Sequence, residues 1–226
     1  ETDVIVTSLA DMLPFPKRQL INAAAKYIKK MIPDYSLPTA VRFRKALSLG
    51  KSAGAHKKNH ITGHDSTIVL QYTGGTTGVA KGAELTNLNL IANMLQARAN
   101  MAQVDDNGKP LKPAEGATVV APLPLYHIYS FTVHLMAMLD SGDHSILIAN
   151  PRDPGMFIKM IKPHRLDGFV GLNTLFVGLL NHPEFKECNF EHLNLTLSGG
   201  TALMDDTAKR WKETTGCGIS EGYGLT

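Results

Sequence analysis

The segment TGGTTGVAK at residues 73–81 combines glycines, threonines and one lysine in a way that suits a polyphosphate. Glycines let backbone amides approach an oxyanion without interference from a Cβ atom. Threonine hydroxyls add hydrogen-bond donors, and Lys81 adds a mobile positive charge that can follow phosphoryl oxygens. A glycine-rich turn without a ligand is the alternative, but this density of residue types favours a phosphate-binding loop.

Three common phosphate-binding motifs do not match this loop. A P-loop requires GxxxxGK[ST], whereas Lys81 lies between Ala80 and Gly82. A dinucleotide fingerprint requires GxGxxG, which GGTTG does not supply. Glycine-rich kinase loops lie in β-hairpins and come with further signatures that the sequence lacks. The loop therefore belongs to another class of phosphate-binding protein.

The elements that must position this loop follow from an alternation of short apolar runs with helical stretches. We expect strands at residues 4–9, 67–73, 117–123, 145–150, 168–173, 193–199 and 218–224. We expect helices at residues 87–102, 130–140, 154–161, 174–180 and 205–215. Repeated strand–helix–strand order requires crossover connections, so the predicted fold class is α/β with mostly parallel sheets.

The strand before the loop, TIVLQYT (67–73), is an apolar and β-branched run of the kind that is covered on both faces. Thr86 or Asn87 is a suitable cap for the helix that follows. We therefore expect the loop to leave a strand end and to precede a helix, which is where open α/β sheets bind ligands.

The first part of the chain is basic: residues 1–60 carry 11 Lys and Arg against 4 Asp and Glu. Residues 17–33 predict a helix with an apolar stripe formed by Leu20, Ile21, Ala24, Tyr27, Ile28 and Met31. Such a helix can lie on an anionic membrane surface, or its lysines can be the solvated face of a helix docked on its own protein. Residues 48–66 lack apolar periodicity and predict an exposed loop.

Composition indicates a globular protein, with 43% hydrophobic and 19% charged residues and a net charge of only +3. Cys188 and Cys217 match no metal-ligand or disulfide framework, which favours a reducing compartment. The apolar window 119–140 contains two prolines and two histidines, so we expect buried core rather than a membrane span. No sequence pattern indicates a nucleic-acid partner.

The stretch YTGGTTGVAKG resembles the phosphate-binding signature of the adenylate-forming acyl- and aryl-CoA synthetases, although Val79 and Ala80 replace a commoner pair ending in proline. Three further stretches follow in the family's order. PLPLYHIY (122–129) is similar to the segment beside the carboxylate pocket, SGGTAL (198–203) to the strand end lining adenine, and EGYGLT (221–226) to the segment whose tyrosine stacks on adenine. With NPRDPG (150–155) and GLNTLF (171–176), the chain looks most like bacterial long-chain fatty-acid–CoA ligases.

The resemblance implies an acid–thiol ligase that activates a long-chain fatty acid with ATP through an acyl adenylate and transfers it to coenzyme A. AMP and pyrophosphate are released, and Mg²⁺ is an expected cofactor. Such phosphoryl chemistry asks the protein mainly for alignment and charge stabilisation. The chain also lacks a convincing catalytic triad, which agrees with this chemistry.

The resemblance also implies the site residues. Nucleotide contacts fall on Thr73, Gly74, Gly75, Thr76, Thr77, Gly78, Lys81, Gly200, Thr201, Tyr223, Gly224 and Thr226. Acyl contacts fall on His127, Phe131, Asn173, Thr174 and Phe176. His127, Lys81 and Thr226 are the expected catalytic residues. For the acyl-side residues, a packed core or a plain helix start is the alternative.

We further expect residues 1–226 to be a fragment of one larger N-terminal AMP-binding domain. Its parts would be a basic segment (1–47), the exposed loop (48–66) and the ATP- and acyl-binding core (67–226). A metal-binding glutamate would lie just past Thr226, and a C-terminal domain would follow. Such a fragment would be inactive alone, and exposed strand edges would favour a homodimer. The expected location is cytoplasmic, with peripheral contact to the inner membrane face.

Three alternatives remain open at this point. A P-loop phosphotransferase would produce ADP instead of AMP and pyrophosphate. A non-catalytic acyl- or nucleotide-binding protein could share the fold, and a ligase for another carboxylic acid would share the loops. The acyl chain length does not follow from composition.

Overall fold

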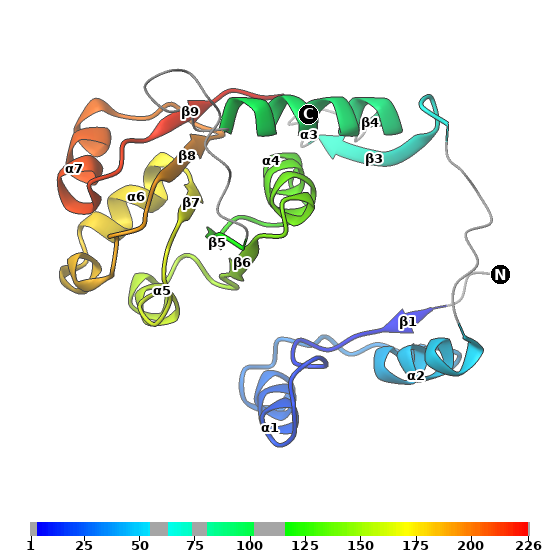
Figure 1. Ribbon diagram of the computed structural model, residues 1–226. Helices are drawn as coiled ribbons and strands as arrows, with labels where there is room; N and C mark the ends of the chain where they lie inside the picture. The colour runs from blue at the N-terminus through cyan, green and yellow to red at the C-terminus, as the bar shows by residue number, and fades with distance from the viewer. Residues whose placement is uncertain (1–3, 55–62, 74–80, 102–115, 226) are drawn as a thin grey trace. The chain divides into compact units, whose positions relative to one another are not determined.

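The computed structural model describes residues 4–54, 63–73, 81–101 and 116–225. The chain divides into two compact units, residues 1–61 and residues 62–226 (Figure 1). Each unit is described by itself.

The first unit is small and mainly helical. Strand β1 (Ile5–Val6) pairs in parallel with β2 (Val41–Arg42), and between them lie α1 (Lys17–Ala23) and the π-helical turn η1 (Ala24–Ile28). The predicted helix 17–33 thus ends early, because Lys30 adopts a positive φ of 48° that a helix cannot accommodate. The large side chains of the predicted apolar stripe are exposed.

Helix α2 (Phe43–Ala53) extends into the segment predicted as the exposed loop 48–66. Leucine, alanine and lysine in this stretch all favour a helix, so local propensity outweighs the glycine and serines. The helix ends at Gly54, whose φ of 85° is readily adopted only by glycine. The remainder of the predicted loop lies largely outside the described residues.

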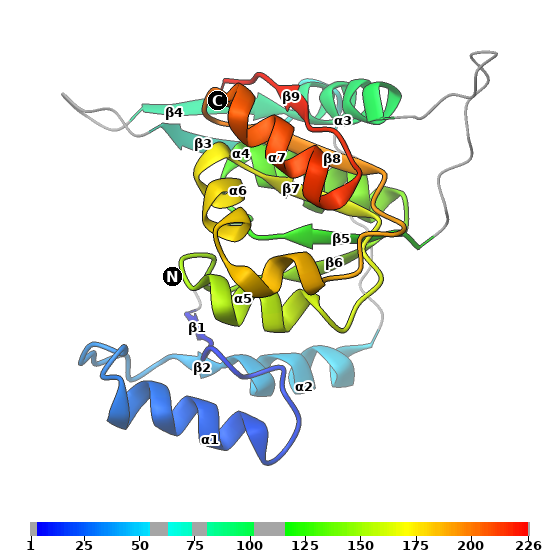
Figure 2. The same cartoon turned by 90° about the vertical axis from the view of Figure 1, so that its left-hand side faces the viewer.

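The second unit contains a five-stranded parallel sheet in the order β6-β5-β7-β8-β9. Its strands are β5 (Thr118–Ala121), β6 (His144–Leu147), β7 (Gly168–Gly171), β8 (Leu195–Gly199) and β9 (Ser220–Gly222). Each strand falls within or beside a predicted range and is shorter than predicted. The parallel sheet with its crossover helices confirms the α/β fold class (Figure 2).

Successive residues of the central strands face opposite sides of this sheet, as the period of two requires. Val120 and Phe169 belong to one buried cluster, whereas their neighbours Val119 and Val170 belong to another. The first cluster packs against helices α5 (Pro154–Ile161), α6 (Asn173–Leu180) and α7 (Asp205–Thr215), and the second packs against η2 (Phe131–Met138). Both faces of β5 and β7 are therefore buried.

Aromatic rings dominate the first cluster. Trp211 lies 4.7 Å from Phe176 and 5.0 Å from Phe169 between ring centroids, with Phe185 at 5.4 Å. The Trp211 Nε1–H donates a hydrogen bond of 3.2 Å to Thr196 Oγ1, so its polar atom is satisfied within the core. Trp211 therefore anchors helix α7 to the sheet through its contacts with Phe169 and Thr196.

The helices of the second unit agree closely with the sequence prediction. α5 (Pro154–Ile161) and α7 (Asp205–Thr215) have the predicted bounds, α6 (Asn173–Leu180) begins one residue earlier, and α3 (Asn87–Met101) reaches the last described residue of its range. Asp153 caps α5 by accepting a 3.0 Å hydrogen bond from Met156 N–H. The predicted helix 130–140 instead consists of α4 (Ile128–Ser130) and the π-helix η2, and a 3₁₀ turn, η3, spans Pro183–Glu187.

The strand before the glycine-rich loop differs from its prediction. β3 (Thr67–Thr73) pairs antiparallel with β4 (Lys81–Thr86), and these two strands form a sheet of their own. Ile68, Leu70 and Tyr72 are exposed on it, so the expectation of a strand covered on both faces is wrong. A single partner strand leaves one edge and much of both faces open, and the apolar composition alone does not reveal this.

The apolar window 119–140 forms buried core, as expected. It contains β5, α4 and η2, and Val120 and Ala137 are fully buried in it. Across the described ranges, no helix has the length and apolar character needed to cross a bilayer.

Cys188 and Cys217 are both buried and free. Burial raises the pKa of the Cys188 thiol to about 11, so the thiol stays protonated at neutral pH.

The aromatic cluster generates a prediction about stability. Phe176→Ala removes a ring with 0% exposure and should lower the free energy of unfolding by about 3–5 kcal/mol. Thr174→Ala, at an exposed position of the same helix, should change it by less than about 0.5 kcal/mol. Urea unfolding followed by the fluorescence of Trp211 measures both, and an equal loss in the two variants would contradict the packing described.

Candidate functional site

The predicted site residues of the second unit lie at the carboxyl ends of its parallel strands. β5 leads into the segment 122–129, β7 into Asn173, β8 into Gly200, and β9 into Tyr223. Because parallel strands end at one edge of the sheet, these segments are placed at the same edge. This is the edge at which open α/β sheets bind ligands.

His127 is held at the start of α4. Its Nδ1 accepts a hydrogen bond of 3.3 Å from the backbone N–H of Tyr129, so the side chain caps the helix. The residue is exposed, which excludes the alternative of a packed core histidine. The cap fixes which ring nitrogen faces the backbone and leaves Nε2 free of that contact.

Tyr129 is a candidate site residue that the sequence analysis did not name. Its ring lies so close to Gly199 that a Cβ atom there would be 2.9 Å from Tyr129 Cζ. Its hydroxyl is buried and has no hydrogen-bond partner among the residues that the structure describes, and burial raises the pKa of the phenol. The sequence analysis could have identified it from its position two residues after His127, in a segment already assigned to the predicted site.

This contact joins two predicted parts of the site. Tyr129 belongs to the segment with His127, and Gly199 pairs in register with Gly222 at the end of the sheet. The ring therefore sets the spacing between the carboxylate-side segment and the strand end predicted to line adenine.

The loop after β8 is shaped by glycine and held by two side chains. Gly200 has a φ of 77°, a conformation that favours glycine. Asn173 Oδ1 accepts a 3.1 Å hydrogen bond from Met204 N–H, and Glu221 Oε2 accepts a 3.3 Å hydrogen bond from Leu203 N–H. Asn173 thus holds the loop that contains Gly200 and Thr201, which is a positioning role that its prediction as an acyl-pocket wall did not include.

Tyr223 presents an open aromatic face. Its side chain is 92% exposed, and Gly224 beside it is also exposed. Thr201 is exposed on the neighbouring loop. A flat ring without protein cover is suited to stacking on a nucleobase.

The structure bears differently on two residues that were predicted to contact the acyl chain, Phe176 and Phe131. Phe176 packs between Phe169 and Trp211 in the aromatic cluster and has no exposed surface, so the prediction that it forms an acyl-pocket wall is wrong. The motif GLNTLF places this ring on the inner face of α6, two residues after the exposed Thr174, which lies on the opposite side of the helix. Phe131 is half-buried at the start of η2, and its role as a gate stays a prediction.

The phosphate loop is closed by the β3–β4 hairpin. Thr73 and Lys81 are register partners, and Thr73 Oγ1 donates a 3.3 Å hydrogen bond to the backbone carbonyl of Lys81. The loop therefore joins two antiparallel strands. It follows β3 and precedes α3, as expected, but β4, which the sequence analysis did not predict, lies between the loop and the helix. The predicted contacts Gly74, Gly75, Thr76, Thr77, Gly78 and Thr226 lie outside the described residues.

The hairpin also contacts the carboxylate-side segment. Gln71 Nε2 donates a 3.3 Å hydrogen bond to the backbone carbonyl of Tyr126, next to His127. The side chain of Lys81 is exposed at the mouth of the hairpin and is free to meet an anion. Within residues 4–54, 63–73, 81–101 and 116–225, no group of three or more histidine, cysteine or acidic side chains could hold a metal ion.

Comparison with known proteins gives a consistent result. The sequence pattern of the family described as AMP-binding enzyme matches residues 1–226. A long-chain-fatty-acid–CoA ligase of Haemophilus influenzae is 45% identical over 99% of this chain, and one of Yersinia pestis is 42% identical over the same share. A solved benzoate CoA ligase from Burkholderia xenovorans LB400 is 25% identical with a TM-score of 0.64, over 84% of this chain and 35% of that chain.

The chain spans 38% of the length of the two ligases it matches. The activity of those complete ligases is therefore a property of a longer protein than this chain.

The contact between Tyr129 and Gly199 generates a prediction. Gly199→Ala should lower the free energy of unfolding by about 1–3 kcal/mol, because its methyl group overlaps the ring. In a Tyr129→Ala background the added loss should fall by more than half, the remainder coming from the Gly222 carbonyl 3.2 Å away. Gly218→Ala, which meets no atom within 4 Å, is the matched control. Urea unfolding measures all four variants, and strict additivity of the two changes would refute the contact.

Proposed function

This chain belongs to the AMP-binding enzyme family, and we propose that the complete protein is a long-chain fatty-acid–CoA ligase. Identities of 45% and 42% to two such ligases support this substrate class. The proposal rests on one observation: two contacts join three segments of the predicted site. Gln71 joins the phosphate hairpin to the His127 segment, and Tyr129 joins that segment to the Gly199–Gly200 strand end.

The proposed reaction has two steps. A carboxylate oxygen of the fatty acid attacks the α-phosphorus of ATP, a P–O bond forms, and pyrophosphate leaves with the electrons of the broken P–O bond. The thiol sulfur of coenzyme A then attacks the acyl carbonyl carbon, AMP leaves, and the thiol proton is lost to solvent. Both steps need alignment and charge stabilisation more than a covalent protein nucleophile.

The nucleotide half of the site would use the exposed groups at the sheet edge. Tyr223 would stack on adenine, with Gly200 and Thr201 along its edge and Gly224 beside it. Thr73 and Lys81 would hold the β- and γ-phosphates together with the loop between them, and Lys81 would neutralise charge that develops on the leaving pyrophosphate. Thr226 would contact a phosphate oxygen.

The acyl half would begin at His127. Its exposed ring, oriented by the cap contact with Tyr129, is suited to hydrogen-bond the fatty-acid carboxylate. Phe131 would cover the acyl chain, and Thr174 is accessible at the start of α6. Asn173 would act through the loop that it holds rather than by direct contact with the acyl chain.

Family membership implies the use of ATP and coenzyme A. For Mg²⁺, the part of the chain that the structure describes contains no cluster of three or more histidine, cysteine or acidic side chains, and we assign no residue to it. A homodimer stays a prediction.

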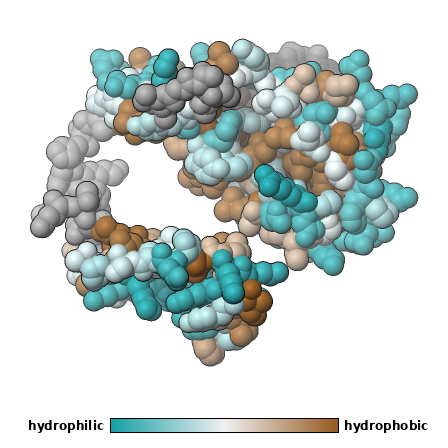
Figure 3. Space-filling view, turned by 180° about the vertical axis from the view of Figure 1, so that it is seen from behind, coloured by the Kyte–Doolittle hydropathy of each residue, from teal (hydrophilic) through white to brown (hydrophobic). Residues whose placement is uncertain are grey.

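The basic first unit supports a second part of the proposal, peripheral contact with an anionic membrane surface on the cytoplasmic side. Leu20, Tyr27 and Ile28 are exposed on α1 and η1, and Lys26 and Lys29 lie beside them. Figure 3 shows apolar side chains next to polar ones on this unit. An exposed face of this kind can insert apolar side chains between lipid headgroups while its lysines meet anionic lipids.

The activity is tested by fatty-acid-dependent exchange between ATP and labelled pyrophosphate, in the complete protein with acids of increasing length. We expect exchange to rise with long acyl chains and to fall by roughly 10²–10³-fold in Lys81→Ala, which loses a charge at the leaving group. Lys159→Ala, an exposed lysine on α5, should leave exchange unchanged. ATP binding without exchange would identify a non-catalytic binding protein, and ADP as product would identify a phosphotransferase. Exchange only with other carboxylic acids would overturn the substrate class.

Membrane contact is tested by co-sedimentation of the complete protein with phosphatidylglycerol vesicles. Lys26→Glu combined with Lys29→Glu should weaken binding by at least about tenfold, since each basic residue near an anionic surface contributes about 1 kcal/mol. Lys209→Glu combined with Lys212→Glu on α7 makes the same change in net charge and should have little effect. Equal losses in the two double variants would show that only net charge matters and would contradict a contact through α1 and η1.

A further inference from the structure

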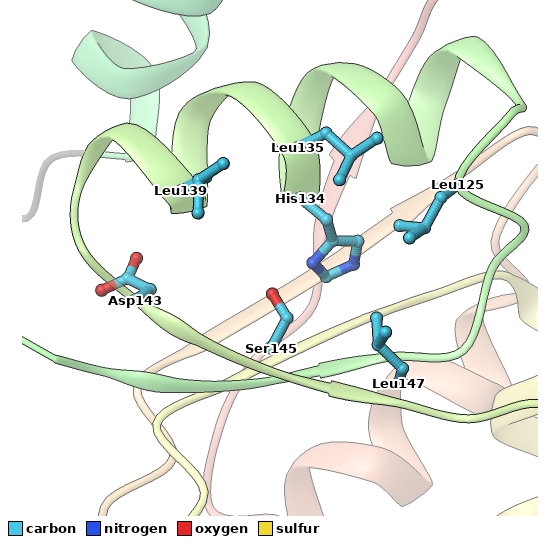
Figure 4. Close-up of a pocket in the computed structure, with 7 residues that line it drawn as sticks. All are labelled: Leu125, His134, Leu135, Leu139, Asp143, Ser145 and Leu147. Carbon is cyan, nitrogen blue, oxygen red and sulfur yellow. The ribbon is translucent and has the colours of Figure 1, made fainter. Parts of the chain in front are cut away.

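The segment that carries His127 is anchored on both sides of this residue. On one side, the Leu125 side chain is directed into the space between η2 and β6, where it lines a pocket together with Leu147 (Figure 4). On the other side, Ser130 is fully buried, and its Oγ donates a hydrogen bond of 3.1 Å to the backbone carbonyl of Leu123. These contacts hold the two ends of the turn that presents His127.

The peptide that joins Tyr126 to His127 lies between these anchors and is fixed by hydrogen bonds. Both side chains are exposed, so packing does not orient this peptide. The His127 N–H donates a 3.0 Å hydrogen bond to the Pro124 carbonyl, and the Tyr126 carbonyl accepts the 3.3 Å hydrogen bond from Gln71 Nε2. A peptide unit is planar, so contacts at its N–H and its C=O together fix the orientation of its plane. The Gln71 contact therefore helps to set the direction in which the His127 imidazole leaves the backbone.

Gln71 belongs to the same strand as the mouth of the phosphate hairpin. Val69 and Gln71 are half-buried on β3, whereas Leu70 between them is exposed, so the Gln71 side chain lies on the covered face of the strand. Thr73 follows two residues later and is the register partner of Lys81. One short strand therefore carries both the hydrogen bond to the carboxylate-side segment and the residue pair that closes the phosphate loop.

The ligase reaction, on which this inference rests, gives the link a role. A carboxylate oxygen held at His127 would attack the α-phosphorus while the pyrophosphate held at Lys81 leaves, and the attacking and leaving oxygens must be roughly in line. Their alignment depends on the placement of the His127 peptide relative to β3. We propose that Gln71 is a positioning residue for the adenylation step. It acts through His127, which it aligns with the phosphate hairpin, and not by contact with ATP or the acyl chain.

The test is the kinetics of fatty-acid-dependent ATP–pyrophosphate exchange in the complete protein carrying Gln71→Met, which keeps the length of the side chain and removes the donor. We expect kcat to fall by roughly 10- to 100-fold, because a small misplacement of reacting groups has a large effect on rate. The KM for ATP should change by less than about twofold, because the nucleotide contacts stay in place. Leu70→Met introduces the same side chain on the exposed face of β3 and should leave both constants unchanged.

A double-mutant cycle with His127→Ala separates a positioning role from a merely structural one. In the His127→Ala background, Gln71→Met should lower kcat by less than about twofold, because the residue through which Gln71 acts is absent. Gln71→Glu has the same shape and lacks the donor at pH 7, so it should reproduce the fall in kcat and replaces Gln71→Met where that variant fails to fold.

Three outcomes would count against this role. Wild-type exchange with an unchanged kcat in the Gln71 variants would overturn it and leave the ligase function standing. Equal losses of kcat with and without His127 would also overturn it, because Gln71 would then act independently of that residue. Absence of exchange in the wild-type protein with every fatty acid would overturn the ligase function and the role of Gln71 with it.

Discussion

The burial of both faces of the central parallel strands is the constraint on which the second unit depends. Val119 and Val120 point to opposite clusters, as do Phe169 and Val170, so each strand contributes to two cores at once. Only small or apolar side chains fit between the two layers. Gly168, for example, lies against Val119, where a Cβ atom would come within 3.0 Å of a valine methyl group. A change on either face therefore affects the strand that carries the other face.

For the same reason, the exposed polar side chains of the predicted site lie at the strand ends. Inside the sheet, polar groups are few. Trp211 pairs with Thr196, and the Asp167 carboxylate pairs with Arg165 and the Thr118 N–H, whereas the buried Ser198 hydroxyl has no partner among the described residues. Beyond the last ladder residues the chain is free to carry His127, Gly200 and Tyr223 in exposed positions. The same arrangement of layers thus buries the aromatic side chains between sheet and helices and leaves the predicted site residues accessible at the strand ends. Asn173 and Glu221 connect them, because each begins at the sheet edge and holds the loop after β8.

The sequence predicted the parallel sheet and its helices well because these elements carry strong local signals. Asp153 and Pro154 mark the start of α5, and Gly216 with its φ of 77° marks the end of α7. The resemblance to the adenylate-forming synthetases, and not these local signals, pointed to His127, Gly200 and Tyr223 as candidate site residues. Contacts between distant segments were beyond such reasoning: the position of Tyr129 against Gly199 depends on two residues far apart in the chain. The apolar run TIVLQYT does not reveal whether its strand has one neighbour or two, and Phe176 reads equally well as a pocket wall or as core.

The strand order also has a consequence for the time at which the sheet can form during synthesis. β5 lies between β6 and β7, and its first residue, Thr118, is hydrogen-bonded to Asp167, the residue just before β7 and 49 residues later in the chain. Until that segment has been made, β5 can pair on one side only, whereas the β3–β4 hairpin needs only nearby residues. The phosphate hairpin can therefore form early on the emerging chain. The sheet edge that would complete the proposed nucleotide site must wait for β8 and β9, so the two halves of the proposed site are assembled at different stages of translation.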